Sequence, residues 1–135
     1  MSALPPKFPI TAEQIDQVVI RFYARMRNHR ELGPVFANHI DDWRPHEAKI
    51  ASFWRNAIGL DRSFEGNPQQ AHTAALDIKS EHFALWLALF DETLGDTLPS
   101  QTAAAWSALA HRIGRALQMS IDQRDAPKDA PPKLF

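Results

Sequence analysis

Apolar residues recur every three or four positions along four long stretches of this chain, which is the spacing of a buried face on an amphipathic helix. The first stretch follows Thr11, where Gln14 completes a capping box, and we expect this helix to end at Gly33-Pro34. No stretch alternates between apolar and polar residues as a half-buried strand does, so the pattern predicts an all-α fold. The inward face of the first helix would carry Ile15, Val18, Val19, Phe22, Tyr23 and Met26.

Start and stop signals divide the rest of the chain in the same way. Asp41 and Asp42 are suited to cap a helix, Pro68 to begin one and Gly59 to end one. Residues 35–40 indicate a short apolar turn, and residues 60–67 indicate a loop. We therefore expect one helix from Asp41-Asp42 to Gly59, a short helix from Asn67-Pro68 to about Leu76, one from Ser80 to Gly95, and one from about Ser100 to Ile121.

Domain organisation follows from the length and from the two ends of the chain. A chain of 135 residues suits a single domain with its own core. We expect an extended N-terminal segment over residues 1–10, one helical domain over 11–122, and a disordered tail over 123–135, which is rich in proline and charge.

Composition excludes several classes of protein and site. The formal net charge of −1 gives no sign of a nucleic-acid or membrane surface. The absence of cysteine excludes disulfides, thiolate zinc sites, iron–sulfur clusters and a cysteine nucleophile. No apolar run approaches the roughly 20 residues of a membrane helix, and the proline-rich N-terminus lacks the apolar segment of a signal peptide. These features predict a soluble, cytoplasmic protein, which we expect to be a monomer.

Four polar side chains stand where an ordinary helical core would not need them. Tyr23, His46 and Trp86 fall on the apolar faces of three predicted helices, and His72 lies on a short helix with few apolar neighbours. A buried polar group without a hydrogen-bond partner costs free energy. Four such groups on four elements indicate a polar partner inside the fold, and a metal-bearing cofactor is the simplest one.

Each of these residues also has an ordinary interpretation, which spacing alone favours. His72 could be an axial iron ligand through a neutral imidazole, or a solvent-facing histidine. His46 could contact a bound ligand, or it could bond to a backbone carbonyl at the edge of the core. Tyr23 and Trp86 could donate hydrogen bonds to such a ligand, or they could only pack. Lys49, three residues after His46, could reach a cofactor carboxylate or remain solvated.

Other motifs of catalytic chemistry are absent from the sequence. It contains no HExxH, no P-loop, no GxGxxG and no Gly-x-Ser-x-Gly, and we find no convincing nucleophile–base pair.

Six segments, taken in order, resemble the truncated haemoglobins of group III, over about residues 12 to 120. No single segment is specific, and the ordered set carries the resemblance. The paired-glycine motifs of the other two truncated groups are missing, as they are in group III, whereas His82 stands where a larger apolar residue would be expected. The segments are Phe22-Tyr23, Leu32 to Phe36, Trp43 to Ile50, Phe53-Trp54, Gly66-Asn67-Pro68 with His72, and His82 to Phe90.

The resemblance implies a two-over-two helical sandwich around haem b, which is iron protoporphyrin IX. It implies that His72 is the proximal iron ligand and that Lys49 pairs with a propionate. The distal side would be formed by Tyr23, His46 and Trp86, and the cofactor-binding residues would be Phe36, Lys49, Ile50, Phe53, Trp54 and Leu76.

The function implied by the resemblance is reversible binding of dioxygen, with CO, NO or peroxide as further small ligands and oxygen transport as one role. The same residues would also suit an enzyme, either a nitric-oxide dioxygenase or a peroxidase-like protein, which would need a reductase not encoded in this chain. The alternative from another class is a cofactor-free helical interaction domain, because every residue above has an ordinary interpretation.

Overall fold

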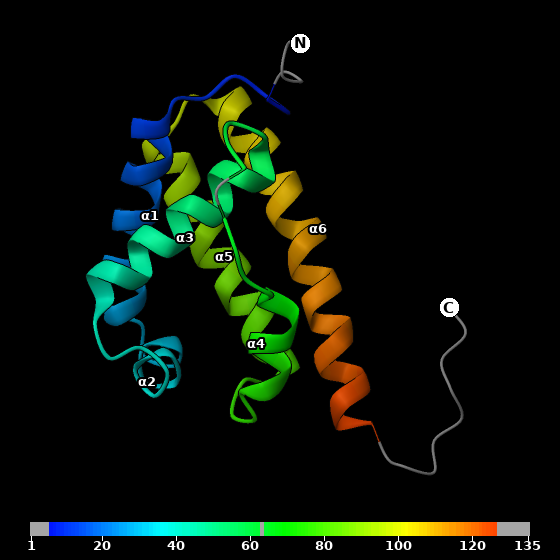
Figure 1. The fold of residues 1–135 in the computed structure, drawn as a ribbon. Coiled ribbons are helices and arrows are strands. Elements are labelled where there is room, and N and C mark those ends of the chain that lie inside the picture. Colours follow the sequence, from blue (N-terminus) through cyan, green and yellow to red (C-terminus); the bar gives the residue numbers. More distant parts are fainter. Residues whose placement is uncertain (1–5, 63, 127–135) are drawn as a thin grey trace.

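The computed structural model describes residues 6–62 and 64–126, and within these residues it contains six helices and no strand (Figure 1). The all-α prediction is therefore confirmed. The helices are α1 (Ala12–Arg27), α2 (Leu32–Ala37), α3 (Trp43–Ile58), α4 (Pro68–Ala74), α5 (Ser80–Thr97) and α6 (Ser100–Asp125).

The four long helices form two packed pairs. Helix α1 packs on α3, and α5 packs on α6, while contacts between α1 and α5 join the pairs (Figure 1). Only Leu98 and Pro99 separate α5 from α6, so these two helices run in opposite directions. The short helices lie at the edge of this arrangement, with α2 against α1 and α5, and α4 against α6.

Aromatic rings fill the centre of the fold, and we call Phe22, Trp54, Phe90 and Trp106 the aromatic core. Each of the four side chains is at most 2 % exposed. Phe90 contacts the other three at ring-centroid distances of 5.1 to 5.6 Å. Edge-to-face and stacked pairs at this distance add to the free energy gained by burial. This cluster joins all four long helices, because each contributes one of its rings.

Several helix ends lie where local sequence predicts them. The Thr11 hydroxyl and the Gln14 side chain form the expected capping box at the start of α1. The Asp42 carboxylate accepts the Arg44 N–H at the start of α3, and Asn67 accepts the Gln70 N–H at the start of α4. Gly59 ends α3 in the left-handed conformation, at φ 100°, which glycine adopts without strain.

The prediction that the first helix continues to Gly33-Pro34 is wrong. Helix α1 ends at Arg27, and Gly33 and Pro34 lie in the first turn of α2. The His29 imidazole causes the difference, because its Nδ1 accepts the backbone N–H groups of Glu31 and Leu32 at 3.1 and 3.0 Å. A histidine thus caps α2, and proline in a first turn leaves no hydrogen bond unmade.

The later helix boundaries also differ from the prediction. Ser80 is the first residue of α5 and not its cap; the N–H of Lys79 is instead accepted by Nδ1 of His82. Helix α5 continues through Gly95 to Thr97, since a single glycine costs a helix only about 1 kcal/mol. Helix α4 ends at Ala74 instead of near Leu76.

The two ends of the chain are described in part. Residues 6–10 are not helical, and the Lys7 N–H bonds to the Ile58 carbonyl at 2.9 Å. Helix α6 continues to Asp125, past the predicted end at Ile121, so residues 123–125 of the predicted tail are helical. The rest of that tail, residues 127–135, and residues 1–5 lie outside the described residues. Within the described ranges, no helix combines the length and apolarity needed to cross a bilayer.

Candidate functional site

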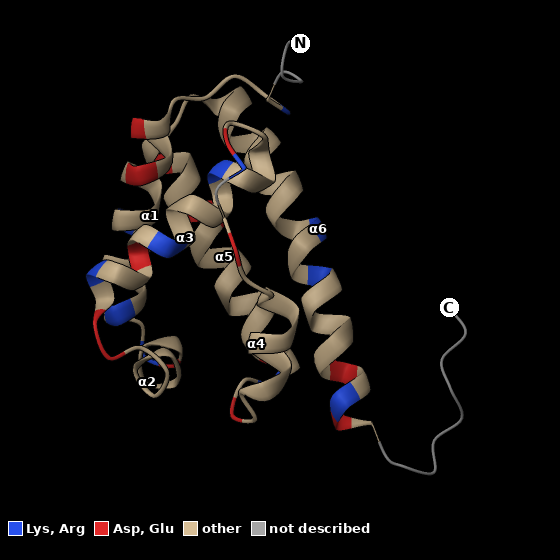
Figure 2. Ribbon diagram, in the orientation of Figure 1, with Lys and Arg blue, Asp and Glu red and all other residues tan. Residues whose placement is uncertain are grey.

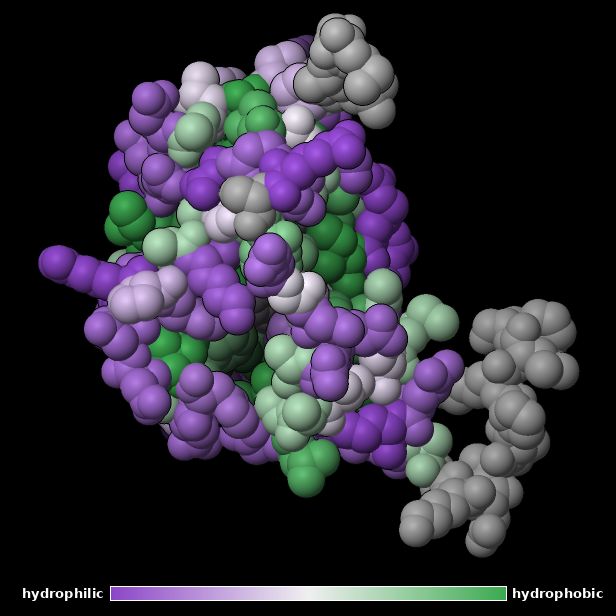
Figure 3. Space-filling model, in the orientation of Figure 1, coloured by the Kyte–Doolittle hydropathy of each residue, from purple (hydrophilic) through white to green (hydrophobic). Residues whose placement is uncertain are grey.

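A cavity of about 460 Å³ lies between the two helix pairs and α4. Figure 3 shows the molecule hollowed on this face, with hydrophobic residues in the depth of the hollow and mostly hydrophilic residues around it. The volume is in the range of about 300–1,000 Å³ that is usual for small-molecule sites. Its walls are mainly apolar and include Val35, Phe36, Ile50, Phe53, Ile113 and Leu117.

His72 enters the cavity from α4, a helix of seven residues. Asn67 caps this helix and Pro68 occupies its first position, so its start is fixed by local sequence. The His72 Nδ1–H donates to the Pro68 carbonyl at 2.6 Å. In a neutral histidine whose proton is on Nδ1, the lone pair is on Nε2, and this is the arrangement found in metal-ligating histidines.

Tyr23 and His46 form a hydrogen-bonded pair on the opposite wall, which α1 and α3 provide. The Tyr23 hydroxyl lies 3.2 Å from Nε2 of His46, and the tyrosine side chain is 3 % exposed. Burial, and to a smaller extent the charge of Glu47, raises the pKa of Tyr23 well above its usual range. The phenol therefore keeps its proton near neutral pH and remains a hydrogen-bond donor.

The His46 imidazole is held in its neutral form. Burial lowers its pKa from the ordinary histidine value, and electrostatic interactions with Lys49 and His72 lower it further. A neutral ring has one N–H and one lone pair. With the proton on Nδ1, His46 accepts from Tyr23; with the proton on Nε2, it donates to the tyrosine oxygen and leaves the phenol O–H free for another acceptor.

Trp86 lies in the cavity wall on α5. Its ring stacks on Phe90 at 5.2 Å, with an angle of 4° between planes, and meets the edge of Phe22 at 5.6 Å. Two core rings therefore fix its orientation. Within the described residues, the indole N–H has no hydrogen-bond acceptor, so it is available to a molecule in the cavity.

The structure brings together nine of the ten residues that the sequence singled out. Leu76 is the exception, and its prediction as a cavity residue is wrong, because its side chain is 69 % exposed and it does not line the cavity. The helix that carries His72 ends two residues earlier, and the following turn directs Ala75 and Ile78 to the cavity instead. The nine residues that line the cavity are Tyr23, Phe36, His46, Lys49, Ile50, Phe53, Trp54, His72 and Trp86.

Sequence reasoning missed the groups that join α2 to the turn after α4. Asp77 accepts hydrogen bonds from Nε2 of His39 at 2.6 Å and from the Asn38 amide at 3.1 Å. These bonds lower the pKa of Asp77, His39 being the larger cause. His39 lines the cavity, as does His82. No local signal marks the His39–Asp77 pair, since its members are 38 residues apart.

The cavity suits a flat, apolar group that carries a metal ion and acidic substituents. Phe36, Phe53 and Trp86 are apolar and only partly buried, so each leaves ring surface facing the cavity. His72 offers one imidazole nitrogen as a metal ligand, and the exposed Lys49 lies where a carboxylate could meet it. The residues present therefore fit the cofactor that the sequence resemblance implies.

Comparisons with known proteins agree with this geometry. The family model for bacterial-like globins matches residues 11–121. A group 3 truncated hemoglobin of Campylobacter jejuni is 34% identical over 89 residues, which span 63% of this chain and 70% of that protein. The crystal structure of a group III truncated hemoglobin from Campylobacter jejuni superposes with a TM-score of 0.82 at 28% identity, and covers 90% of this chain and 99% of the other.

Proposed function

The chain belongs to the bacterial-like globins and, within them, to the group 3 truncated haemoglobins, and on that premise we propose that it binds haem b through His72 and binds dioxygen reversibly. The two-over-two arrangement of the long helices is the fold of this family, and haem is the cofactor that the family implies. Carbon monoxide and nitric oxide are further ligands of the same site in this proposal.

The observation that carries the proposal is the hydrogen bond from Nδ1 of His72 to the Pro68 carbonyl. It selects the tautomer whose Nε2 can coordinate iron, and it holds the ring in one plane. Bound haem would supply a redox-active iron, whose chemistry includes the binding of diatomic gases. The protein supplies the ligand, its orientation and a site of low polarity.

The opposite wall would stabilise a polar diatomic ligand by hydrogen bonds. Tyr23 keeps its phenol proton because of its burial, and Trp86 keeps its indole N–H. His46 is neutral, so it adds no positive charge and can exchange its hydrogen bond with Tyr23. Donors in a site of low polarity form stronger hydrogen bonds than the same donors in water.

The rest of the cavity would hold the macrocycle. The aromatic rings of Phe36, Phe53 and Trp54 line it, Ile50 adds an aliphatic side chain, and together they would exclude water from a bound porphyrin. Lys49 is exposed, so it can pair with a propionate at the surface while its stem packs against the cavity.

The visible absorption spectrum of the purified protein tests this proposal. We expect a Soret band that shifts when the reduced protein meets carbon monoxide, and a His72→Gly variant that loses the five-coordinate spectrum and regains it with added imidazole. Oxygen should bind and leave without turnover. Consumption of NO or peroxide with an added electron donor would instead support the alternative in which the protein is an enzyme, either a nitric-oxide dioxygenase or a peroxidase-like protein. A colourless protein that takes up no added haemin would leave the cofactor-free interaction domain.

A further inference from the structure

Helix α4 carries the proposed metal ligand, yet its own sequence does little to hold it in place. It has seven residues and none of them is buried. It also contains no Lys, Arg, Asp or Glu, so Figure 2 draws it without charge colours. Helices shorter than about 12 residues are marginal in water without tertiary contacts. Among the described helices, the backbone of α4 packs on α6, while the His72 ring also lies 6.1 Å from the Phe83 ring of α5. The main backbone support for α4 therefore comes from α6.

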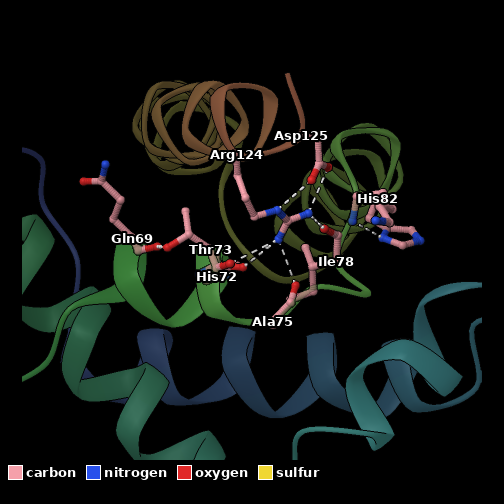
Figure 4. A network of polar contacts seen from close by, with 9 residues as sticks. Gln69, His72, Thr73, Ala75, Ile78, His82, Arg124 and Asp125 are labelled. Carbon is pink, nitrogen blue, oxygen red and sulfur yellow. Dashed lines mark hydrogen bonds and ion pairs between the residues drawn. The ribbon is translucent and has the colours of Figure 1, made fainter. Parts of the chain in front are cut away.

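The strongest of these contacts come from one side chain, Arg124, near the end of α6 (Figure 4). Its Nη2 donates to the Ile78 carbonyl at 2.7 Å, and its Nη1 donates to the Ala75 carbonyl at 3.0 Å. Nη1 also lies 3.3 and 3.4 Å from the carbonyls of Thr73 and His72. The last carbonyls of a helix have no partner within the helix, and a cation there is favourable.

Asp125 fixes the plane of the same guanidinium. Its carboxylate accepts from Nε and Nη2 of Arg124 at 2.8 and 2.9 Å, a bidentate pair. The hydrogen bonds from Arg124 lower the pKa of Asp125, which keeps the carboxylate ionised. The Arg124 side chain is only 13 % exposed, so its packed stem and its paired end leave little rotamer freedom. A planar group held on one edge presents its remaining donors in one direction.

A second bond ties the beginning of α4 to the same face of α6. The Gln69 amide donates to the Ser120 hydroxyl at 2.8 Å. Ser120 precedes Arg124 by one helical turn, so the two contacts come from adjacent positions on α6. Gln69 and the Ala75 carbonyl lie at opposite ends of α4, and the two bonds together set both its position and its rotation.

We propose that Arg124 is a positioning residue that clamps the C-terminal end of α4 to α6 and so sets the direction in which His72 presents its Nε2. The link to the ring is short, because the imidazole is bonded to the backbone of the helix that Arg124 holds. The hydrogen bonds described above support the contact between Arg124 and α4. The effect of this contact on iron coordination rests on the proposed function. Arg124 touches neither the cavity nor a ligand in it.

Two measurements on the full chain test the proposal separately. The first is hydrogen exchange of residues 68–78 in Arg124→Gln, without haem and with haemin added. We expect exchange at least tenfold faster than in the unmodified protein, with α5 unchanged. Arg124→Lys keeps the positive charge but lacks the planar set of donors. Its exchange rate over residues 68–78 should lie between those of Arg124→Gln and the unmodified protein. Arg115→Gln removes an exposed arginine from the same helix and should match the unmodified protein.

The second measurement is the iron–histidine stretching band of the ferrous, haemin-reconstituted protein, together with the rate of haem transfer to an excess of a haem-scavenging apoglobin. In Arg124→Gln we expect the band to shift to lower frequency and broaden, and haem transfer to become several-fold faster. Both should be unchanged in Arg115→Gln.

The outcomes separate the clamp from the proposed function. Unchanged exchange over residues 68–78 would overturn the clamp, whether or not haem binds. Faster exchange with an unchanged iron–histidine band would overturn the positioning of His72. An unmodified protein that takes up no haemin would overturn the proposed function, and the exchange measurement without haem would still decide whether Arg124 holds α4.

Discussion

Two regions of this molecule are held together by different physics. The aromatic core, which consists of Phe22, Trp54, Phe90 and Trp106, is almost without solvent exposure and is formed by contacts between rings. The segment over residues 67–79, which contains α4, buries no side chain of that helix and is held by hydrogen bonds from α6 and α2.

The difference shows that, in a small helical domain, the residues that stabilise the fold can be different from those that position the binding site. Burial of apolar area is the main favourable term in folding, so the four long helices can form a stable unit. The segment that bears His72 contributes little burial and depends on directional contacts, which set geometry more than they set stability. A cofactor in the cavity would add the apolar contact that this segment lacks.

The largest effect is expected from removing the ring at the centre of the aromatic core. Phe90→Ala should lower the free energy of unfolding by roughly 3–5 kcal/mol, because the cavity left among four other rings cannot collapse easily. Urea unfolding followed by far-UV circular dichroism measures this loss. The exposed Leu76 is the control, and Leu76→Ala should change stability by less than about 0.5 kcal/mol. A similar loss in both variants would contradict the comparison.

The next effect concerns haem itself. The protein without haem should be less stable than the protein with haem by about 2.7 kcal/mol when free haem is 100 times its dissociation constant, since a ligand that binds only the native state stabilises it. Thermal unfolding with and without haemin measures the difference. His72→Ala should gain less from the same concentration of haemin. Equal melting temperatures in the two forms would count against a cofactor that completes the α4 side.

The role of the cavity wall opposite His72 in binding oxygen can be tested by deleting the Tyr23 hydroxyl. Tyr23→Phe should raise the oxygen dissociation rate several-fold to roughly a hundredfold, as expected for the loss of a hydrogen bond worth about 1–3 kcal/mol. Stopped-flow mixing of the oxygenated protein with excess carbon monoxide measures the rate. His111→Gln changes a histidine that pairs with Asp91 outside the cavity and should leave the rate unchanged. An unchanged rate in Tyr23→Phe would remove tyrosine from the distal role.

The smallest effect is a pH dependence at the bond between α2 and the turn after α4. His39 and Asn38 lower the pKa of Asp77, so the stability that this carboxylate contributes is present above its unfolded pKa, about 3.9, and is lost as pH falls through the lower folded value. Asp77→Asn should therefore be less stable than the unmodified protein at pH 7 and nearly equal to it near pH 2.

The magnitude should stay below about 1 kcal/mol, because the Asp77 and His39 side chains are each 40% exposed. Unfolding free energies at the two pH values measure the effect. Glu65→Gln, at an exposed carboxylate, should give no pH-dependent difference. A stability difference between Asp77→Asn and the unmodified protein that increased toward low pH would contradict this prediction.

Local sequence predicted those features that depend on neighbours along the chain. The caps at Thr11, Asp42 and Asn67, the stop at Gly59 and the helical periods each involve residues a few positions apart. Site residues on long helices also followed from periodicity together with the family resemblance. Two of the wrong helix boundaries lie where a histidine side chain accepts backbone N–H groups, as His29 does at the start of α2 and His82 does at the start of α5.

The features that sequence could not supply depend on contacts between distant segments. Arg124 bonds to carbonyls 46 to 52 residues earlier, and His39 meets Asp77 across 38 residues. Backbone carbonyls are present at every residue, so no residue type marks the partners of Arg124. The exposed Leu76 lies in a turn that receives such bonds, because Arg124 donates to the carbonyls of Ala75 and Ile78 on either side of it.

The stack of Trp86, Phe90 and Trp54 also gives the protein an optical property. Trp86 and Trp54 both line the cavity, and each stacks on Phe90, at 5.2 and 5.4 Å. Indole emission overlaps the absorption of porphyrins, so a chromophore in the cavity would accept excitation energy from both rings at close range. The tryptophan fluorescence of the chain should therefore be quenched as the cavity fills. Its intensity would then report the fraction of protein with an occupied cavity, without an added label.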